Sequence, residues 1–188
     1  VIRLQSTAES HDRVMILEVM GRDSGYISLH GGLAGGANII LIPEIPFDYN
    51  VINKKIKDRQ KLGRNFSVIV VAEGAKNKIK QDKQIGNIGQ IIANKISQIS
   101  NVETRVTVLG HLQRGGQPNA SDRNLATTLA IHAVDLIDQK KFSRIVISKN
   151  ADIIDIPYNN IKKWERKKIS TRDKYLIAAE SIGVCLGR

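Results

Sequence analysis

Short apolar runs recur along the chain, and they are continuous rather than alternating with polar residues. Continuous runs are typical of strands that are buried on both faces of a parallel sheet. The strands predicted in this way are Val14–Val19, Ile39–Ile42, Val68–Ala72, Val106–Leu109 and Ile145–Ile147.

The segments between these runs are long enough to form the helices that connect parallel strands. The predicted helices are Tyr26–Leu33, Tyr49–Leu62, Ile85–Ile99 and Asn124–Ile137. Gly63 stands where the second of them would end, and Asn119 or Ser121 stands where the last would begin. Strands that alternate with helices predict an α/β fold, in which helices flank a mainly parallel sheet.

The composition is that of a globular protein, because 41% of the 188 residues are hydrophobic and 25% are charged. No apolar run approaches the roughly 20 residues of a membrane-spanning helix. Cys185 is the only cysteine, and the chain opens on Val1 without an initiator methionine or a signal-peptide pattern. We therefore expect a soluble cytoplasmic protein that binds no membrane and is cut from a longer chain.

Charge is the unusual feature, because 29 lysines and arginines against 18 aspartates and glutamates give a net charge of +11. Such an excess implies an acidic partner or substrate. Much of it lies in the lysine-rich stretches 54–64, 76–83 and 162–174, and runs of this kind are most often solvated faces. Aromatic residues make up only 4%, so we expect no nucleic-acid binding. A non-catalytic basic module that binds nucleic acid is the alternative.

The carboxyl ends of the predicted strands carry the residues suited to chemistry. In an open parallel sheet these ends meet at one edge, and ligands bind there. The predicted ends are Met20–Gly25, Pro43–Glu44, Glu73–Gly74 and Gly110–Gly116. Two arginines, a histidine and several carboxylates thus fall on one edge, among glycines that let a ligand approach the backbone.

Arg22 and Arg114 are candidates for binding a phosphate, because a guanidinium donates two parallel hydrogen bonds and stays charged. A surface salt bridge is the alternative for either arginine alone. His111 could donate to a phosphate, act as a general acid or serve the fold. Glu73 could accept hydrogen bonds from sugar hydroxyls or pair with an arginine. Together these residues predict a site that binds an anion but does not itself catalyse the breaking of a bond.

Motifs at these positions resemble the 6-phosphofructokinase family. The stretches that match the family in order and spacing are Thr7–Arg13, Glu18–Arg22, Val108–Gly116 and Asp122–Arg123. The similarity runs from about residue 3 to Gly183. It covers the carboxyl-terminal half of the family's enzymes, which holds fructose 6-phosphate, so the fold would be the second half of a two-domain phosphofructokinase.

The resemblance implies a fructose 6-phosphate site built from several strand ends. Its implied substrate-binding residues are Met20, Gly21, Arg22, Glu73, His111 and Arg114. Glu73 would contact the sugar hydroxyls, and His111 and Arg114 would bind the phosphate. Arg22, together with Arg13, is also a candidate for stabilising charge on the transferring phosphoryl group.

The resemblance also implies that subunits share sites, so that the protein is a homo-oligomer, either a dimer or a tetramer. Arg13 and Arg105 match arginines that reach the neighbouring subunit's sugar site in this family. They stand before or at the start of predicted strands, whereas Arg22 and Arg114 follow strand ends. We therefore expect the two pairs of arginines at opposite edges of the sheet.

The family implies that the complete protein is a phosphotransferase of glycolysis. It would transfer a phosphoryl group from ATP or pyrophosphate to the 1-hydroxyl of fructose 6-phosphate. The donor-binding glycines, the Mg²⁺ ligands and the catalytic aspartate belong to the amino-terminal half, which would precede Val1, so this chain alone is not a complete kinase. A truncated regulatory homologue is a further alternative. Pro43–Phe47 and Val71–Gly74 resemble the branch with both donor types, so the sequence leaves the donor open.

Two domain assignments follow from the resemblance. Residues 1–112 and 164–188 would form the sugar-phosphate-binding domain. Residues 113–163 would pack with the donor-binding domain, and would expose apolar surface without it. Gln5 and Asn38 stand where the allosterically regulated bacterial enzymes have an arginine and an acidic residue, which puts regulation by a bound nucleoside diphosphate in question.

Overall fold

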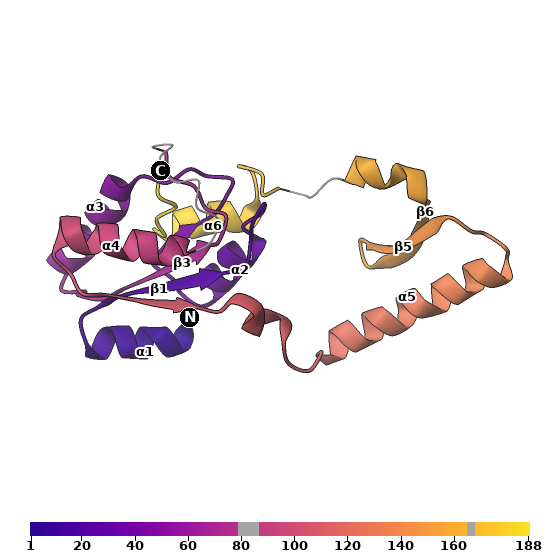
Figure 1. The fold of residues 1–188 in the computed structure, drawn as a ribbon, viewed down its shortest axis with the longest axis horizontal. Helices are drawn as coiled ribbons and strands as arrows, with labels where there is room; N and C mark the ends of the chain where they lie inside the picture. Colours follow the sequence, from indigo (N-terminus) through magenta and orange to yellow (C-terminus); the bar gives the residue numbers. More distant parts are fainter. Residues whose placement is uncertain (79–86, 165–167) are drawn as a thin grey trace. The chain divides into compact units, whose positions relative to one another are not determined.

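The computed structural model describes residues 1–78, 87–164 and 168–188, with 162–164 by their backbone alone (Figure 1). The chain divides into two compact units, Val1–Arg114 with Lys168–Arg188 and Gly115–Lys167. These limits lie a few residues from the predicted ones, and the roles assigned to the two parts stay predictions. Parts of two lysine-rich stretches, 79–83 and 165–167, and the predicted helix start at 85–86 lie outside the described residues.

A four-stranded parallel sheet forms the centre of the first unit, as the apolar runs predict. Its strands, in the order β2-β3-β1-β4, are β1 (Val14–Val19), β2 (Ile39–Leu41), β3 (Ser67–Ala72) and β4 (Thr104–Val108). Every residue of β1, β2 and β3 is buried, whereas β4 at the edge is partly exposed. The continuous apolar runs therefore belong to strands that are covered on both faces.

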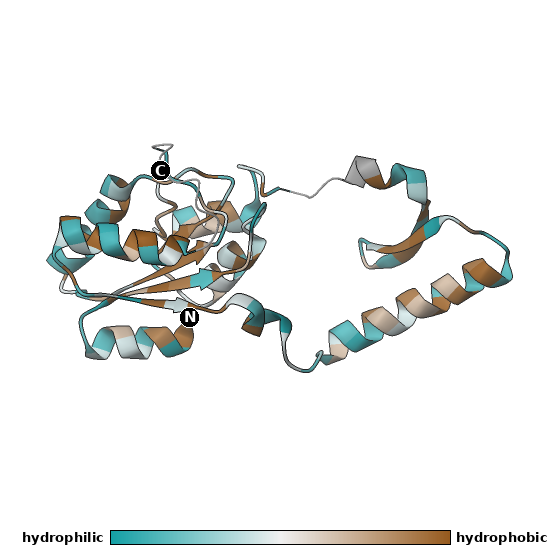
Figure 2. Cartoon of the chain, in the orientation of Figure 1, coloured by the Kyte–Doolittle hydropathy of each residue, from teal (hydrophilic) through white to brown (hydrophobic). Residues whose placement is uncertain are grey.

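Helices cover both faces of this sheet. Those of the first unit are α1 (Ile2–Ser10), α2 (Tyr26–Ala34), α3 (Tyr49–Lys61), α4 (Ile88–Ser100) and α6 (Lys174–Ser181). One apolar cluster joins the sheet to α3 and α4 through side chains such as Ile56 and Ile92. A second cluster joins the other face to α2 and α6 through Leu29 and Leu176. Figure 2 shows the apolar residues concentrated on the strands of this unit, between its helices.

The second unit contains one long helix and a hairpin. Its elements are α5 (Ala120–Asp138), β5 (Arg144–Lys149), β6 (Asp152–Pro157) and the 3₁₀ helix η2 (Tyr158–Trp164). The N-cap of α5 is Asn119, one of the two predicted N-caps, and its side chain accepts from the Asp122 amide over 2.9 Å. Ile131, Val134 and Ile137 on α5 are each more than half exposed. None of the helices among the described residues is both long and apolar enough to cross a membrane.

The run at Ile145–Ile147 does form a strand, β5, but the prediction that it joins the parallel sheet is wrong. β5 pairs with β6 in the antiparallel direction, in a separate two-stranded sheet. Asn150 and Ala151 give the physical reason, because both have positive φ angles, 53° and 74°. Positive φ at both central residues is what the type I′ turn of a two-residue hairpin requires.

Candidate functional site

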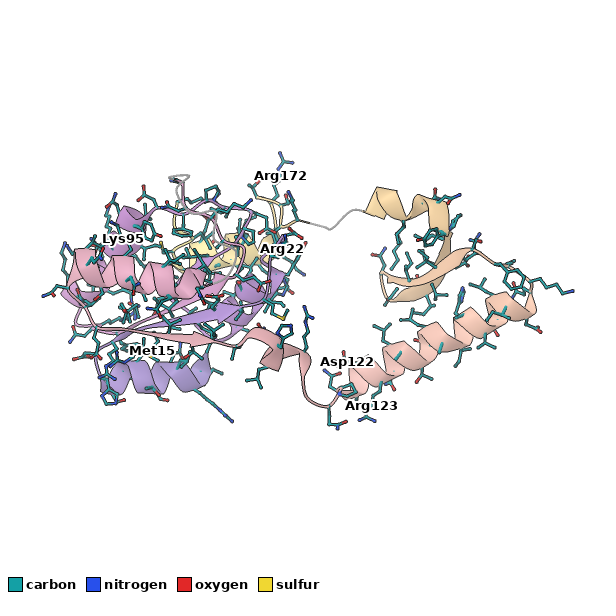
Figure 3. All side chains as sticks on the ribbon, viewed as in Figure 1. Met15, Arg22, Lys95, Asp122, Arg123 and Arg172 are labelled. Carbon is teal, nitrogen blue, oxygen red and sulfur yellow. The ribbon has the colours of Figure 1, made fainter. Side chains whose placement is uncertain are left out.

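The loop after β1, Met20–Gly25, lies against the loop after β3. The Gly74 amide donates to the Gly21 carbonyl over 3.1 Å, and the Glu73 amide donates to the carbonyl of the last residue of β1 over 2.9 Å. A Cβ on Gly74 would lie 1.9 Å from the Arg22 carbonyl oxygen, so only glycine allows this approach. These backbone contacts hold Arg22, labelled in Figure 3, and Glu73 on adjacent loops.

The 3₁₀ helix η1 (Gly110–Arg114) brings His111 and Arg114 to the same edge of the sheet. It follows β4, which pairs in parallel with β1, so both strands end on the same side. The side-chain oxygen of Gln113 accepts a hydrogen bond from the Met20 amide over 2.7 Å and ties η1 to the loop after β1. His111 and Arg114 are both exposed there. The structure thus gathers the predicted residues of three loops at one edge.

Arg13 and Arg105 lie together at the opposite end of the sheet. Both pair with Glu103, whose carboxylate oxygens lie 2.7 Å from Arg13 Nε and 2.5 Å from Arg105 Nη2. The hydrogen bond from Arg13, with a smaller contribution from the charge of Arg105, holds the pKa of the Glu103 carboxyl below its ordinary range. The whole of β1, which is six residues long, lies between Arg13 and Arg22. A strand of this length spans about 20 Å.

Glu44 follows β2, and its carboxylate accepts hydrogen bonds from main-chain amides. Its two oxygens lie 3.2 and 3.1 Å from the Gly25 amide nitrogen, and one of them also accepts from the Ile169 amide over 3.0 Å. Gly25 is the N-cap of α2, where amides lack partners within the helix and a negative charge is stabilised. A cavity of about 110 Å³ at this place is lined by Arg22, Asp23, Pro43, Glu44, Lys76 and Lys168.

Glu18 is a buried carboxylate inside the apolar run of β1. Its side chain is 4% exposed and accepts from the Gly89 amide over 2.8 Å, at the start of α4. A Cβ on Gly89 would lie 3.0 Å from the carboxylate oxygen, so the glycine leaves room for it. Glu18 thus fixes the start of α4 against the sheet.

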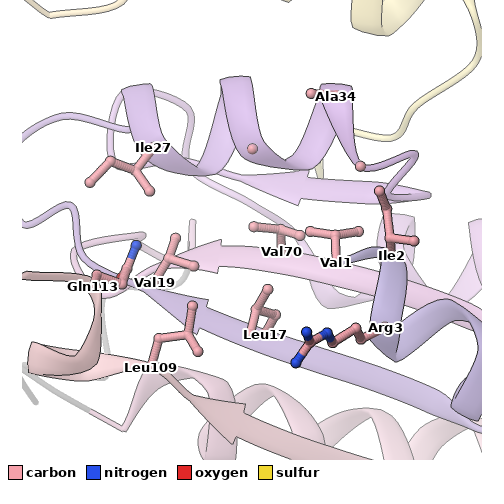
Figure 4. Close-up of a pocket in the computed structure, with 12 residues that line it drawn as sticks. Val1, Ile2, Arg3, Leu17, Val19, Ile27, Ala34, Val70, Leu109 and Gln113 are labelled. Carbon is pink, nitrogen blue, oxygen red and sulfur yellow. The ribbon is translucent and has the colours of Figure 1, made fainter. Parts of the chain in front are cut away.

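A larger pocket, of about 510 Å³, lies between α1, α2 and the sheet (Figure 4). Apolar side chains such as Val19, Ile27 and Leu109 line it, and Arg3 and Gln113 supply its polar groups. A mainly apolar lining does not suit a phosphate, which needs charged or polar donors. We therefore place the candidate anion site at the edge of the sheet and not in this pocket.

The described residues contain no cluster of three or more His, Cys, Asp or Glu side chains that could hold a metal ion. Gln5 and Asn38 both make side-chain hydrogen bonds to main-chain groups that stabilise the fold. The Gln5 side chain donates to the Gly36 carbonyl over 2.8 Å, and the Asn38 side-chain oxygen accepts from the Val68 amide over 2.9 Å.

Sequence reasoning missed the residues that hold the edge together. Gln113 lies inside a motif and Glu44 at a predicted strand end, but neither had a predicted role. Both bind main-chain amides of segments far away in the sequence. A bond to a main-chain amide places no demand on the partner's residue type, so it leaves no pattern in the sequence. Their place among the strand-end residues was the one available signal.

Comparison with known proteins gives one family. The family model described as phosphofructokinase matches residues 1–137. A curated relative from Synechocystis sp., named ATP-dependent 6-phosphofructokinase 1, is 44% identical over 98% of this chain and 54% of its own length. ATP-dependent 6-phosphofructokinase 3 from Bacteroides thetaiotaomicron is 41% identical over 98% of this chain and 53% of its own length. The chain therefore spans about half the length of these relatives.

Solved structures agree with the family model. The phosphofructokinase from Saccharomyces cerevisiae matches with a TM-score of 0.74 and 30% identity, over 85% of this chain and 22% of that chain. A pyrophosphate-dependent phosphofructokinase from Marinobacter aquaeolei matches with a TM-score of 0.77, over 98% of this chain and 48% of that chain. Its identity is 23%, so that match shows a shared fold alone.

Proposed function

Because this chain belongs to the phosphofructokinase family, we propose that it forms the fructose 6-phosphate-binding half of a 6-phosphofructokinase. The observation that carries the proposal is the placement of Arg22, Glu73, His111 and Arg114 on neighbouring loops at the carboxyl edge of one parallel sheet. The complete protein would transfer a phosphoryl group to the 1-hydroxyl of the sugar. The group that takes the proton from that hydroxyl would lie outside this chain.

The substrate phosphate would bind to Arg114 and His111. Both side chains are exposed on η1, and an arginine offers a phosphate two parallel, charge-assisted hydrogen bonds. Glu73 would accept hydrogen bonds from the sugar hydroxyls and so orient the ring. Met20 and Gly21 would bring their backbone against the sugar.

Arg22 would face the transferring phosphoryl group. Phosphoryl transfer depends mostly on positioning and on stabilising the charge of the transition state, and a guanidinium fixed on a short loop supplies both. The contact between Gly74 and the Arg22 carbonyl supports this role, because it limits how far the loop can move.

Arg13 and Arg105 would complete the site of a neighbouring subunit, so we propose a homo-oligomer. Their position at the amino ends of β1 and β4 supports this role, because one phosphate cannot contact both ends of a strand that spans about 20 Å. Glu103 would hold the two guanidinium groups side by side, ready for a shared anion. Arg13 would add its charge to that of the neighbour's Arg22 during transfer.

The unit Gly115–Lys167 would pack with the donor-binding domain of the complete protein. The exposed Ile131, Val134 and Ile137 of α5 support this proposal, because an apolar helix face of this kind is normally covered. The curated relatives described above are named ATP-dependent, which supports ATP over pyrophosphate as the donor. Mg²⁺, which offsets the charge of the donor phosphates, would bind in that domain. We place the protein in the cytoplasm.

An assay of the complete gene product with fructose 6-phosphate tests the proposal. We expect formation of the bisphosphate with ATP and Mg²⁺, and much slower formation with pyrophosphate. No product with either donor would contradict the proposed function, and faster turnover with pyrophosphate would contradict the choice of donor. The alternative of a basic nucleic-acid-binding module is not favoured, because the relatives described above are named 6-phosphofructokinases.

A further inference from the structure

The chain passes between its two units at two places; the first is bonded directly to the loop that carries Arg22, and the second is bonded to it through Glu44. The chain leaves the first unit after Arg114 and re-enters it at Lys168. The residue before Arg114 is Gln113, which accepts the hydrogen bond from the Met20 amide. The residue after Lys168 is Ile169, whose amide donates to Glu44.

The Met20–Gly25 loop is thus held at both of its ends. At its start, the Met20 amide donates to Gln113 Oε1 over 2.7 Å. At its end, the Gly25 amide lies 3.2 and 3.1 Å from the two oxygens of Glu44, the same carboxylate that accepts from the re-entering chain. Arg22 lies between the two anchored amides, so its backbone has little freedom that is independent of them.

The anchor at Glu44 is set in tightly packed surroundings. Ile169 is 6% exposed and belongs to the same apolar cluster as Val19 and Leu29. A Cβ on Gly25 would lie 2.3 Å from the Ile42 side chain, so the backbone of the loop presses directly against the end of β2. Because the packing leaves no free space, a shift of the chain at Ile169 would also move the Met20–Gly25 loop.

We propose that Gln113 and Glu44 are positioning residues. They couple the position of Arg22 to the position of the chain at its two crossings between the units. Each acts through a main-chain amide of the Arg22 loop and touches no substrate itself. A change at either crossing, such as one that follows donor binding elsewhere in the protein, would move one end of this loop. The coupling matters for catalysis only if Arg22 serves the proposed reaction, so the proposal rests on the proposed function.

Substitutions in the complete gene product test the proposal through kcat/KM for fructose 6-phosphate. Glu44→Gln places an amide NH₂ group against backbone donors, and Gln113→Leu removes the acceptor for Met20. We expect each to lower kcat/KM by on the order of tenfold to 100-fold, the size of effect that slight misplacement of a catalytic group produces. Gln113→Glu keeps an acceptor oxygen and is expected to restore most of the activity.

Asp48→Asn is the matched control. Asp48 is also a carboxylate that accepts from a backbone amide at the start of a helix, that of Asn50 over 2.8 Å, but it is the N-cap of α3. We expect this variant to keep the activity of the wild type. An equal loss of activity in Asp48→Asn and Glu44→Gln would show a general effect of replacing a carboxylate at a helix start with an amide, and would overturn the proposal.

Combining each substitution with Arg22→Ala distinguishes an effect on the position of Arg22 from a general loss of structure. If Gln113 and Glu44 act through Arg22, then Glu44→Gln and Gln113→Leu lower kcat/KM no further once Arg22 is alanine. A further loss as large as in the wild-type background would mean independent effects and would overturn the proposal. Wild-type protein with no activity toward fructose 6-phosphate would instead overturn the proposed function.

Hydrogen exchange provides a readout that does not depend on activity. In Gln113→Leu and Glu44→Gln, the amides of Met20 and Gly25 are expected to exchange faster by about tenfold or more, because each lost bond had protected one of them. The amides of β3 should exchange as in the wild type. Unchanged exchange at Met20 and Gly25 would overturn the proposal even in an active enzyme.

Discussion

Glu103 pairs with Arg13 and Arg105, and its pKa makes this contact sensitive to acid. The lowered pKa means that the folded protein keeps this carboxylate charged at a pH where the unfolded chain binds a proton. Its contribution to stability is therefore present above the ordinary glutamate pKa of about 4.3, and it is lost as the pH falls through the lower folded value. The side chain is well exposed, so the contribution is small and falls with added salt.

We predict that Glu103→Gln lowers the midpoint of thermal unfolding slightly at neutral pH and not at all in strong acid. Unfolding curves of wild type and variant across the acid range measure the difference. A difference that stays the same at every pH would show that the charge of Glu103 does not act through the two arginines.

The loops after β1 and β3 depend on one glycine, and a matched pair of substitutions tests this contact. Gly74→Ala would place a methyl group 1.9 Å from the Arg22 carbonyl oxygen, and backbone on both sides prevents an easy escape. We predict a loss of about 1–3 kcal/mol in the free energy of unfolding, as for other overpacked sites. Gly31→Ala on α2 meets no atom within 4 Å and should instead stabilise the protein, by about 0.5–1 kcal/mol, because alanine favours helix.

Urea unfolding of the two variants and the wild type measures both effects. The Gly74→Ala variant should also bind fructose 6-phosphate more weakly, because the loop that carries Arg22 must shift. Equal stability of the two variants would contradict the close contact between the loops.

The parallel strands and most helices were predictable because burial on both faces leaves continuous apolar runs with connecting segments between them. α1 was not predictable from its pattern, since Ala8 is its only buried residue. β6 and the antiparallel pairing of β5 were missed because the turn residues Asn150 and Ala151 lack the glycine that usually marks such a hairpin. The edge of the sheet that carries the candidate site could be predicted, because the direction of parallel strands determines where their carboxyl ends lie. The hydrogen bonds of Gln113 and Glu44 could not be predicted, because they depend on backbone groups that only the fold brings near.

The proposed assembly makes each site depend on two subunits, which mixing of variants can test. Arg13→Ala removes a group that would serve the neighbour, and Arg114→Ala removes a group of the subunit's own site. When the two weakened variants are dissociated, reassembled together and assayed at a low concentration of fructose 6-phosphate, some sites receive both defects and others receive none. We predict that activity returns on mixing, as measured by turnover of fructose 6-phosphate. Hybrids that are shown to assemble but turn over no faster than either parent at that concentration would contradict shared sites.

Calorimetric titration of the complete gene product with fructose 6-phosphate tests the proposed site most directly. We predict that Arg114→Ala and His111→Ala each weaken binding by on the order of 1.5–3 kcal/mol, roughly tenfold or more in the dissociation constant, because each removes a charge-assisted bond to the phosphate. Lys95→Ala, which removes an exposed positive charge from α4 (Figure 3), should bind as the wild type does. Unchanged affinity in both the Arg114 and His111 variants would contradict a sugar-phosphate site at this edge of the sheet.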